Sequence, residues 1–159
     1  MPSVLFVCTG NIFRSMVAEY ALKLQLGRGT AYRVGSAGIR AEPQAIPGLI
    51  HDHLLVRGVD ASLHMQRKLT EELLDQTDLV VSMGLDHREF IRNEFGREAP
   101  LFNRICYQRD DPILDVHEAI PDWERNLEST RAYVISVIDH IWESAPVLFT
   151  KLSGHFTRD

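Results

Sequence analysis

Short apolar runs alternate with longer amphipathic segments along this chain of 159 residues. Two runs rich in β-branched residues, Ser3–Val7 and Asp78–Met83, are typical of buried strands. Weaker runs predict two more strands, Ala31–Val34 and Pro100–Ile105. Apolar residues at helical spacing predict helices at Ser15–Leu26, at Ala45–Val56, after Lys68, at Asp86–Phe95 and from about Glu124 to Trp142.

The order of these elements indicates the fold class. Strands that alternate with helices favour a parallel sheet, because parallel neighbours need helical crossovers. We therefore expect an α/β fold, a single three-layer domain with a parallel sheet of about four strands and helices on both faces. This domain covers residues 1–145, and the tail, residues 146–159, shows no clear periodicity.

Composition excludes several classes of protein. The apolar fraction of 45% is ordinary for a globular protein, and no apolar run approaches the roughly 18 residues of a membrane span. A net charge of −5 argues against nucleic acid or an acidic membrane as a partner. The chain does not open with a secretion signal, so we expect a cytoplasmic protein. The two cysteines, Cys8 and Cys106, exclude a disulfide scaffold, and no paired-cysteine metal motif occurs.

The segment that follows the first predicted strand carries the candidate chemistry. Cys8 stands at the carboxyl end of that strand, where ligands bind in parallel sheets. Arg14 follows six residues later, and a helix is predicted to begin directly after it. The spacing alone occurs often by chance, but a glycine-containing loop between a strand and a helix can direct its backbone N–H groups into one anion-binding concavity.

A phosphate in this loop would meet backbone donors and the planar guanidinium of Arg14. The same donors would stabilise a Cys8 thiolate and make it a nucleophile. Gly10 would permit the winding of the loop, Asn11 would hold it by side-chain hydrogen bonds, and Ser15 would donate to the thiolate or cap the helix. The simpler alternatives are a buried structural cysteine and a capping serine.

The opening segment VLFVCTGNIFRSMVAEYALK resembles that of the low-molecular-weight protein tyrosine phosphatases, which reads C-x-G-N-x-C-R-S-x-x-A-E after an apolar strand. The segments VGSAGI, GVDASLHMQRKLT and DLVVSM follow in that family's order. The resemblance is strong over about the first 95 residues and looser beyond them.

The resemblance implies a phosphomonoester hydrolase that works without metal or other cofactor through a cysteinyl-phosphate intermediate. Cys8 would be the nucleophile, and Arg14 with the backbone from Thr9 through Ser15 would bind the phosphate. The expected partners are a phosphotyrosine protein or an aryl phosphate as substrate and inorganic phosphate as product. His64 falls in the family's H-x-x-R segment, which implies that it orients the phosphate loop.

An aspartate should protonate the leaving phenolate and then activate water. We expect Asp122, which precedes the last predicted helix as the family's acid does and stands beside Trp123. Asp111, which a proline follows, and Asp115 are the alternatives. Asp122 is also expected to cap that helix.

Two residues depart from the family pattern and bear on substrate choice. Phe13 replaces the family's second loop cysteine, and with Trp123 it is a candidate wall for the substrate ring. Ile12 stands where the protein-arginine phosphatases of this superfamily tend to carry threonine, which favours phosphotyrosine. The substrate-binding candidates are thus Thr9, Gly10, Asn11, Ile12, Phe13, Ser15 and Trp123.

Three further functions stay open at this point. Arsenate reductases share the loop but pass a disulfide outward through further cysteines, and only Cys106 is available. A protein-arginine phosphatase and a catalytically silent module that binds phosphoproteins are the second and third.

Overall fold

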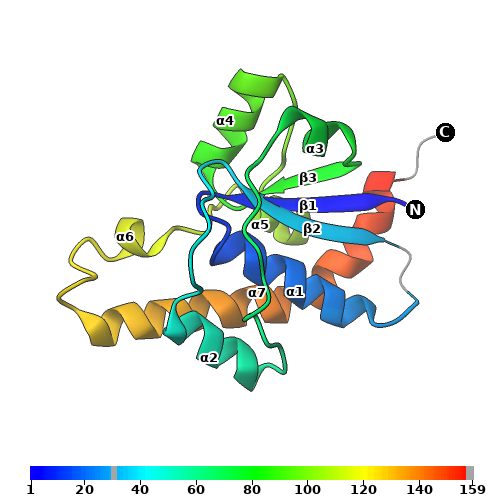
Figure 1. The fold of residues 1–159 in the computed structure, drawn as a ribbon. Coiled ribbons are helices and arrows are strands. Elements are labelled where there is room, and N and C mark those ends of the chain that lie inside the picture. Colours follow the sequence, from blue (N-terminus) through cyan, green and yellow to red (C-terminus); the bar gives the residue numbers. More distant parts are fainter. Residues whose placement is uncertain (30–31, 157–159) are drawn as a thin grey trace.

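A three-stranded parallel sheet forms the centre of the computed structural model, which describes residues 1–29 and 32–156 (Figure 1). Its strands are β1 (Ser3–Cys8), β2 (Arg33–Gly38) and β3 (Leu79–Ser82), in the order β2-β1-β3. The register places Cys8 beside Gly38 and Val7 beside Ser82. The predicted strand Ala31–Val34 is thus found as β2, although Ala31 itself lies outside the described residues.

Helices cover both faces of this sheet, so the predicted three-layer α/β fold is confirmed (Figure 1). The helices are α1 (Arg14–Leu26), α2 (Gly48–Val56), α3 (Glu71–Asp75), α4 (Leu85–Phe95), α5 (Phe102–Tyr107), α6 (Val116–Ala119) and α7 (Leu127–Phe156). In Figure 1, α3 and α4 lie on one side of the sheet, and α1, α2 and α7 lie on the other.

The alternation of side chains along β1 builds both halves of the core. Val4, Phe6 and Cys8 belong to the larger apolar cluster, which includes residues of α1, α5 and α7. Leu5 and Val7 point to the opposite face, into a smaller cluster with residues of α3 and α4. Because successive side chains of a strand alternate between faces, Cys8 leaves the sheet on the side of α1 and α7.

The prediction of a fourth strand at Pro100–Ile105 is wrong. Only Leu101 forms an isolated parallel bridge, with Ser82, and helix α5 begins at the next residue. A short apolar segment fits a strand or a buried helix equally well, and here the segment buries Phe102 and Ile105 against the core as a helix.

The C-terminal segment does not form a separate tail. Helix α7 continues through Pro146 to Phe156, and Leu148 and Leu152 are buried in the larger cluster. Pro146 cannot donate a backbone hydrogen bond, and Figure 1 shows the helix changing direction between its orange and red parts. The predicted boundary at residue 145 is therefore wrong, and residues 157–159 of that segment lie outside the described residues.

The beginning of α7 also differs from the prediction. The helix starts at Leu127, and the carbonyl of Asp122 accepts turn hydrogen bonds from Arg125 and Asn126. Asn126 rather than Asp122 caps the helix, because its Oδ1 accepts from the Ser129 N–H at 3.3 Å.

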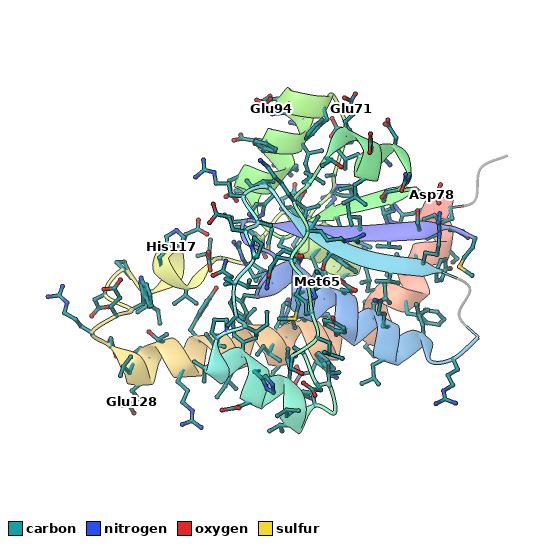
Figure 2. All side chains as sticks on the ribbon, in the orientation of Figure 1. Met65, Glu71, Asp78, Glu94, His117 and Glu128 are labelled. Atoms are coloured by element: carbon teal, nitrogen blue, oxygen red, sulfur yellow. The ribbon has the colours of Figure 1, made fainter. Side chains whose placement is uncertain are left out.

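The surface carries many charged side chains. Figure 2 shows Glu71, Glu94 and Glu128 projecting outward from α3, α4 and α7. Within the described residues, no helix is long and apolar enough to cross a membrane.

Candidate active site

The loop after β1 winds from Cys8 into the first turn of α1, and we call residues 8–14 the phosphate loop. Asn11 adopts a left-handed backbone conformation with φ of 57°. The sequence predicts that Gly10 supplies the unusual conformation, but its φ is not positive and an added Cβ would meet nothing closer than 3.6 Å. Asn11 takes this role because its short polar side chain tolerates the left-handed region and can be held by hydrogen bonds.

Neighbouring segments fix the phosphate loop through its carbonyl groups. The N–H groups of Ile39 and Arg40 donate to the carbonyls of Cys8 and Thr9, each at 2.9 Å. His64 lies with Nε2 2.9 Å from the Asn11 carbonyl, which is a contact that the predicted role of this histidine requires. Gly38 is required beside the loop, because a Cβ there would lie 2.4 Å from the Thr9 carbonyl oxygen.

A buried chain of hydrogen bonds ends on the sulfur of Cys8. The Glu19 carboxylate accepts from the Ser36 hydroxyl, so Asn11 Nδ2 donates to Ser36 Oγ at 2.8 Å. Asn11 Nδ2 also donates to Ser15 Oγ at 2.9 Å, and Ser15 Oγ lies 2.9 Å from Cys8 Sγ. Because Ser15 Oγ accepts from the Asn11 amide, the Ser15 hydroxyl keeps its own proton, which it can donate to an ionised sulfur at Cys8. Ser15 lies within α1 and does not cap it, and its hydroxyl contacts the Cys8 sulfur.

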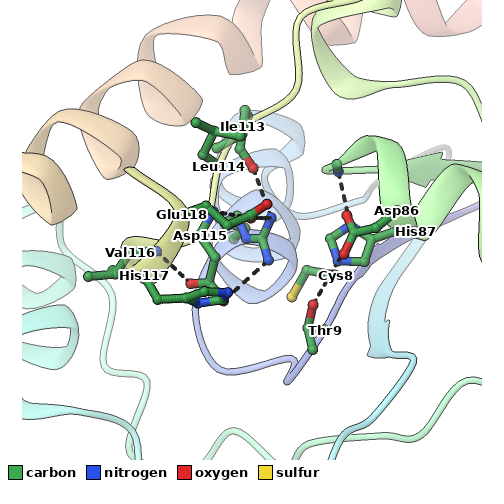
Figure 3. A network of polar contacts seen from close by, with 12 residues as sticks. Cys8, Thr9, Asp86, His87, Ile113, Leu114, Asp115, Val116, His117 and Glu118 are labelled. Carbon is green, nitrogen blue, oxygen red and sulfur yellow. Dashed lines mark hydrogen bonds and ion pairs between the residues drawn. The ribbon is translucent and has the colours of Figure 1, made fainter. Parts of the chain in front are cut away.

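Arg14 is held beside the cysteine by the segment before α6. Its Nη1 donates to the Ile113 carbonyl at 2.8 Å, and its Nη2 lies 3.5 Å from Asp115 Oδ2. A carboxylate oxygen of Glu118 lies 4.0 Å from Nη1. The side chain is only 2% exposed, so its charge acts in a largely water-free setting. Figure 3 shows Asp115 and Glu118 on one side of Cys8.

A cleft of about 540 Å³ opens above Cys8 and Arg14. Its lining is mostly apolar, as expected for a site that takes an aromatic ring. The lining residues are Cys8, Thr9, Gly10, Ile12, Phe13, Arg14, Arg40, Gln44, Pro47, Leu49, Ile50, Asp115, Val116, His117, Trp123, Thr130 and Val134. The structure thus brings together most of the predicted site residues, while Asn11 and Ser15 lie behind the loop and support it.

The three candidate aspartates occupy different positions. Asp115 lines the cleft and caps α6, with its Oδ1 accepting from the Val116 N–H at 2.8 Å. Asp122 is exposed in the turn before α7 and is not among the described residues that line the cleft. Asp111 is also exposed and pairs with Arg109 at 3.2 Å. Of the three, Asp115 is the one that faces the phosphate loop.

Several cleft residues were not predicted from the sequence. Leu49 and Ile50 come from α2, Val134 comes from α7, and Arg40 follows β2. Their segments meet only through packing, so no local motif marks them. Trp123, which was predicted, lines the cleft and is 40% exposed.

His87 also approaches the loop without any signal in the sequence. Its side chain is fully buried, and Nε2 lies 2.9 Å from Thr9 Oγ1. Its Nδ1 accepts the Gly84 N–H at 2.9 Å. Burial, with a smaller contribution from the Arg14 guanidinium, lowers the pKa of His87 to about 4, so the imidazole is neutral at pH 7.

The described residues contain no group of three or more histidine, cysteine, aspartate or glutamate side chains that could hold a metal ion. Arg14 and Arg40 both line the cleft and bring positive charge to it.

Cys106 is poorly suited to redox exchange with Cys8. It is a free thiol, only 3% exposed in the larger apolar cluster, and burial raises its pKa to about 12. At neutral pH the group therefore stays a thiol, which is neither a nucleophile nor a leaving group.

We therefore expect Cys106 to resist alkylation by iodoacetamide at about pH 8 in the folded protein and to react fully after denaturation. Mass spectrometry of the peptide that contains Cys106 measures both states. Rapid labelling of Cys106 in the folded protein would contradict its assignment as an inert core residue.

Comparison with known proteins agrees with this site. Residues 3–155 match the family described as low molecular weight phosphotyrosine protein phosphatase. A low molecular weight protein-tyrosine-phosphatase, Ptp of Acinetobacter johnsonii, is 36% identical in an alignment of 147 residues that covers 79% of this chain and 97% of the relative.

Two further similarities point to a related enzyme. A protein-arginine-phosphatase of Bacillus subtilis is 37% identical over 101 residues, which cover 59% of this chain and 63% of the relative. A crystal structure of a YwlE mutant from Bacillus subtilis superposes with a TM-score of 0.81 at 26% identity, covering 96% of this chain and 99% of the other. The match over residues 3–155 spans nearly the whole chain, which belongs to the low molecular weight phosphotyrosine protein phosphatase family.

Proposed function

We propose that this protein hydrolyses phosphotyrosine in protein substrates and releases inorganic phosphate. The observation that carries the proposal is the mostly apolar cleft above Cys8 and Arg14, with Asp115 and Trp123 on its walls. A tyrosine ring gains free energy from burial against apolar and aromatic side chains. The phosphate at its end would then lie in the phosphate loop.

In the first step, the Cys8 thiolate attacks phosphorus and a sulfur–phosphorus bond forms while the phosphorus–oxygen bond to the ring breaks. Arg14 and the loop amides stabilise the charge on the three equatorial oxygens. The leaving phenolate needs a proton, and we propose Asp115 as its donor in place of Asp122, because Asp115 lines the cleft.

In the second step, water attacks the phosphorus of the cysteinyl phosphate. The same carboxylate, now ionised, takes a proton from that water, and the cysteine leaves as a thiolate. The hydrogen bond from Ser15 to the sulfur favours this departure, because it stabilises the negative charge. Inorganic phosphate is the product.

A protein-arginine phosphatase is the second candidate, favoured by the relative of that name in Bacillus subtilis. A guanidinium group keeps several N–H donors that need acceptors when buried. Ile12, which is half-buried in the cleft, offers no acceptor from its side chain. The apolar side chain at residue 12 therefore favours the phosphotyrosine ring.

Arsenate reduction and silent phosphoprotein binding have less support. An arsenate reductase would need Cys106 as its relay, and that thiol is buried and protonated. A silent binding module would lack a carboxylate at the cleft, whereas Asp115 lies there. The expected cytoplasmic location stays a prediction from the sequence.

A panel of peptides tests the choice of substrate. We expect kcat/KM for a phosphotyrosine peptide to exceed the values for matched phosphoarginine and phosphoserine peptides by at least about tenfold. Inorganic phosphate should inhibit competitively. The matched variant Ile12→Thr should reduce the difference in kcat/KM between the phosphotyrosine and phosphoarginine peptides. Faster release of phosphate from the phosphoarginine peptide by the unmodified chain would reject the proposal in favour of the second candidate.

A further inference from the structure

The neutral histidine behind the phosphate loop has a partner that the reaction described above does not use. The hydroxyl of Thr9 lies between His87 and the cleft, on the side of Cys8 opposite Asp115 (Figure 3). Thr9 follows Cys8 in the chain and lines the same cleft as Cys8 and Arg14.

The direction of the hydrogen bond follows from the second partner of the histidine. Nδ1 accepts the Gly84 N–H at 2.9 Å, so in a neutral ring the proton must be on Nε2. Nε2 therefore donates to Thr9 Oγ1 at 2.9 Å. The carboxylate of Asp86 is a more distant acceptor, with Oδ2 3.5 Å from Nε2, and its side chain is 58% exposed to solvent.

This direction leaves the Thr9 hydroxyl proton free for another acceptor. A hydroxyl has one proton, and the oxygen already accepts from His87. The carbonyl of Thr9 is occupied by the N–H of Arg40. Thr9 is half-buried and lines the cleft, which is where its proton can meet a ligand.

Thr9 and His87 are brought together by the pairing of strands β1 and β3, not by the phosphate loop. Met83 follows β3 and donates its N–H to the Val7 carbonyl at 3.0 Å, so the start of α4 lies beside the end of β1. Gly84 favours the close approach of the ring, because a Cβ at residue 84 would lie 3.1 Å from His87 Nδ1, which is a tight contact.

We propose that the Thr9 hydroxyl donates a hydrogen bond to a phosphoryl oxygen of the bound substrate, and that His87 is the positioning residue that orients it. The proposal rests on the proposed function, and it adds a side-chain ligand to the loop amides and Arg14. A donor held in place before the substrate arrives stabilises the transition state without reorganisation.

Two substitutions of His87 separate its donation to the Thr9 hydroxyl from its acceptance of the Gly84 N–H. His87→Asn keeps an oxygen where Nδ1 accepts from Gly84 but removes the donor that reaches Thr9. His87→Gln restores a donor near the position of Nε2. We expect His87→Asn to lower kcat/KM for an aryl phosphate about 10- to 100-fold, the range for a hydrogen bond to a charged group, and His87→Gln to recover most of the loss.

Substitutions of Thr9 test the hydroxyl itself. Thr9→Val should lower kcat/KM by the same factor as His87→Asn, and Thr9→Ser should stay within about threefold of the unmodified chain. The double variant Thr9→Val, His87→Asn should be no slower than Thr9→Val alone. As a matched control, His53→Asn removes a hydrogen bond from a partly buried histidine to Asp139 and should leave kcat/KM within about twofold.

Binding of inorganic phosphate gives a readout that does not need turnover. In a Cys8→Ser background, calorimetry should show that Thr9→Val and His87→Asn weaken phosphate binding by about tenfold or more. Equal losses from His87→Asn and His87→Gln, or a Thr9→Val variant within about twofold of the unmodified chain in both assays, would overturn the inference. A chain that hydrolyses no aryl phosphate but shows the expected pattern in phosphate binding would refute the proposed function and support this inference.

Discussion

Replacing Cys8 with serine is expected to abolish phosphate release while phosphate binding persists. The serine hydroxyl is a far weaker nucleophile than a thiolate, so we expect kcat to fall by more than about 10³-fold. The amides of the phosphate loop and Arg14 should stay in place, because the N–H groups of Ile39 and Arg40 and the Asn11 side chain hold the loop independently of the sulfur. Steady-state kinetics with an aryl phosphate and calorimetry with inorganic phosphate measure the two effects.

Loss of binding together with turnover would mean that Cys8 shapes the loop rather than attacks the substrate. Cys106→Ser is the matched control, because it replaces the other free cysteine at a site within the core. Its kcat should stay within about twofold, since Cys106 is not among the residues that line the cleft.

Asp115→Asn is expected to lower kcat/KM by about 10²-fold or more, which is the usual contribution of a general acid. Asparagine keeps the cap of α6, because it accepts the same backbone hydrogen bonds, but it cannot donate a proton to the phenolate. The loss should be larger for phenyl phosphate than for an aryl phosphate with a more acidic phenol, since an acidic phenol leaves without protonation. Initial rates with the two substrates check this difference.

Asp122→Asn is the matched control for this result. Its carboxylate stands in the exposed turn before α7, so we expect kcat/KM to stay within about threefold for both substrates. If Asp122→Asn produced the large loss and Asp115→Asn did not, the acid predicted from the sequence would be correct and the one chosen from the structure would be wrong.

The element pattern was largely predictable because it depends on local periodicity. The strand before Cys8 and the helix after it are encoded within one continuous segment, and both are found as β1 and α1. The fourth strand was not predictable, since Pro100–Ile105 is too short for its periodicity to separate a strand from the helix α5. Helix α7 was cut short in the prediction because the sequence after Pro146 shows no clear periodicity. In the structure the helix continues through the proline, and burial of Leu148 and Leu152 offsets the lost hydrogen bond.

The three candidate aspartates show what the sequence alone leaves open. The segment between α5 and α7 contains several aspartates in similar surroundings, and adjacency to Trp123 favoured Asp122. The short helix α6, with Asp115 as its cap and Glu118 accepting from the Asp115 N–H, turns the segment so that Asp115 faces Arg14. That turn depends on contacts between segments far apart in the chain, such as the hydrogen bond from Arg14 to Ile113.

By itself, the sequence determined the phosphate loop, because a cysteine, a glycine, an asparagine, an arginine and a serine stand together between a strand and a helix. The tertiary structure alone decided which aspartate faces that loop, which apolar side chains form the cleft and which histidine contacts Thr9. The physical reason is the distance along the chain over which each interaction acts. Backbone winding and the helix start act between neighbours in the chain, whereas His87 and Asp115 reach the loop only after the sheet and its helices have packed.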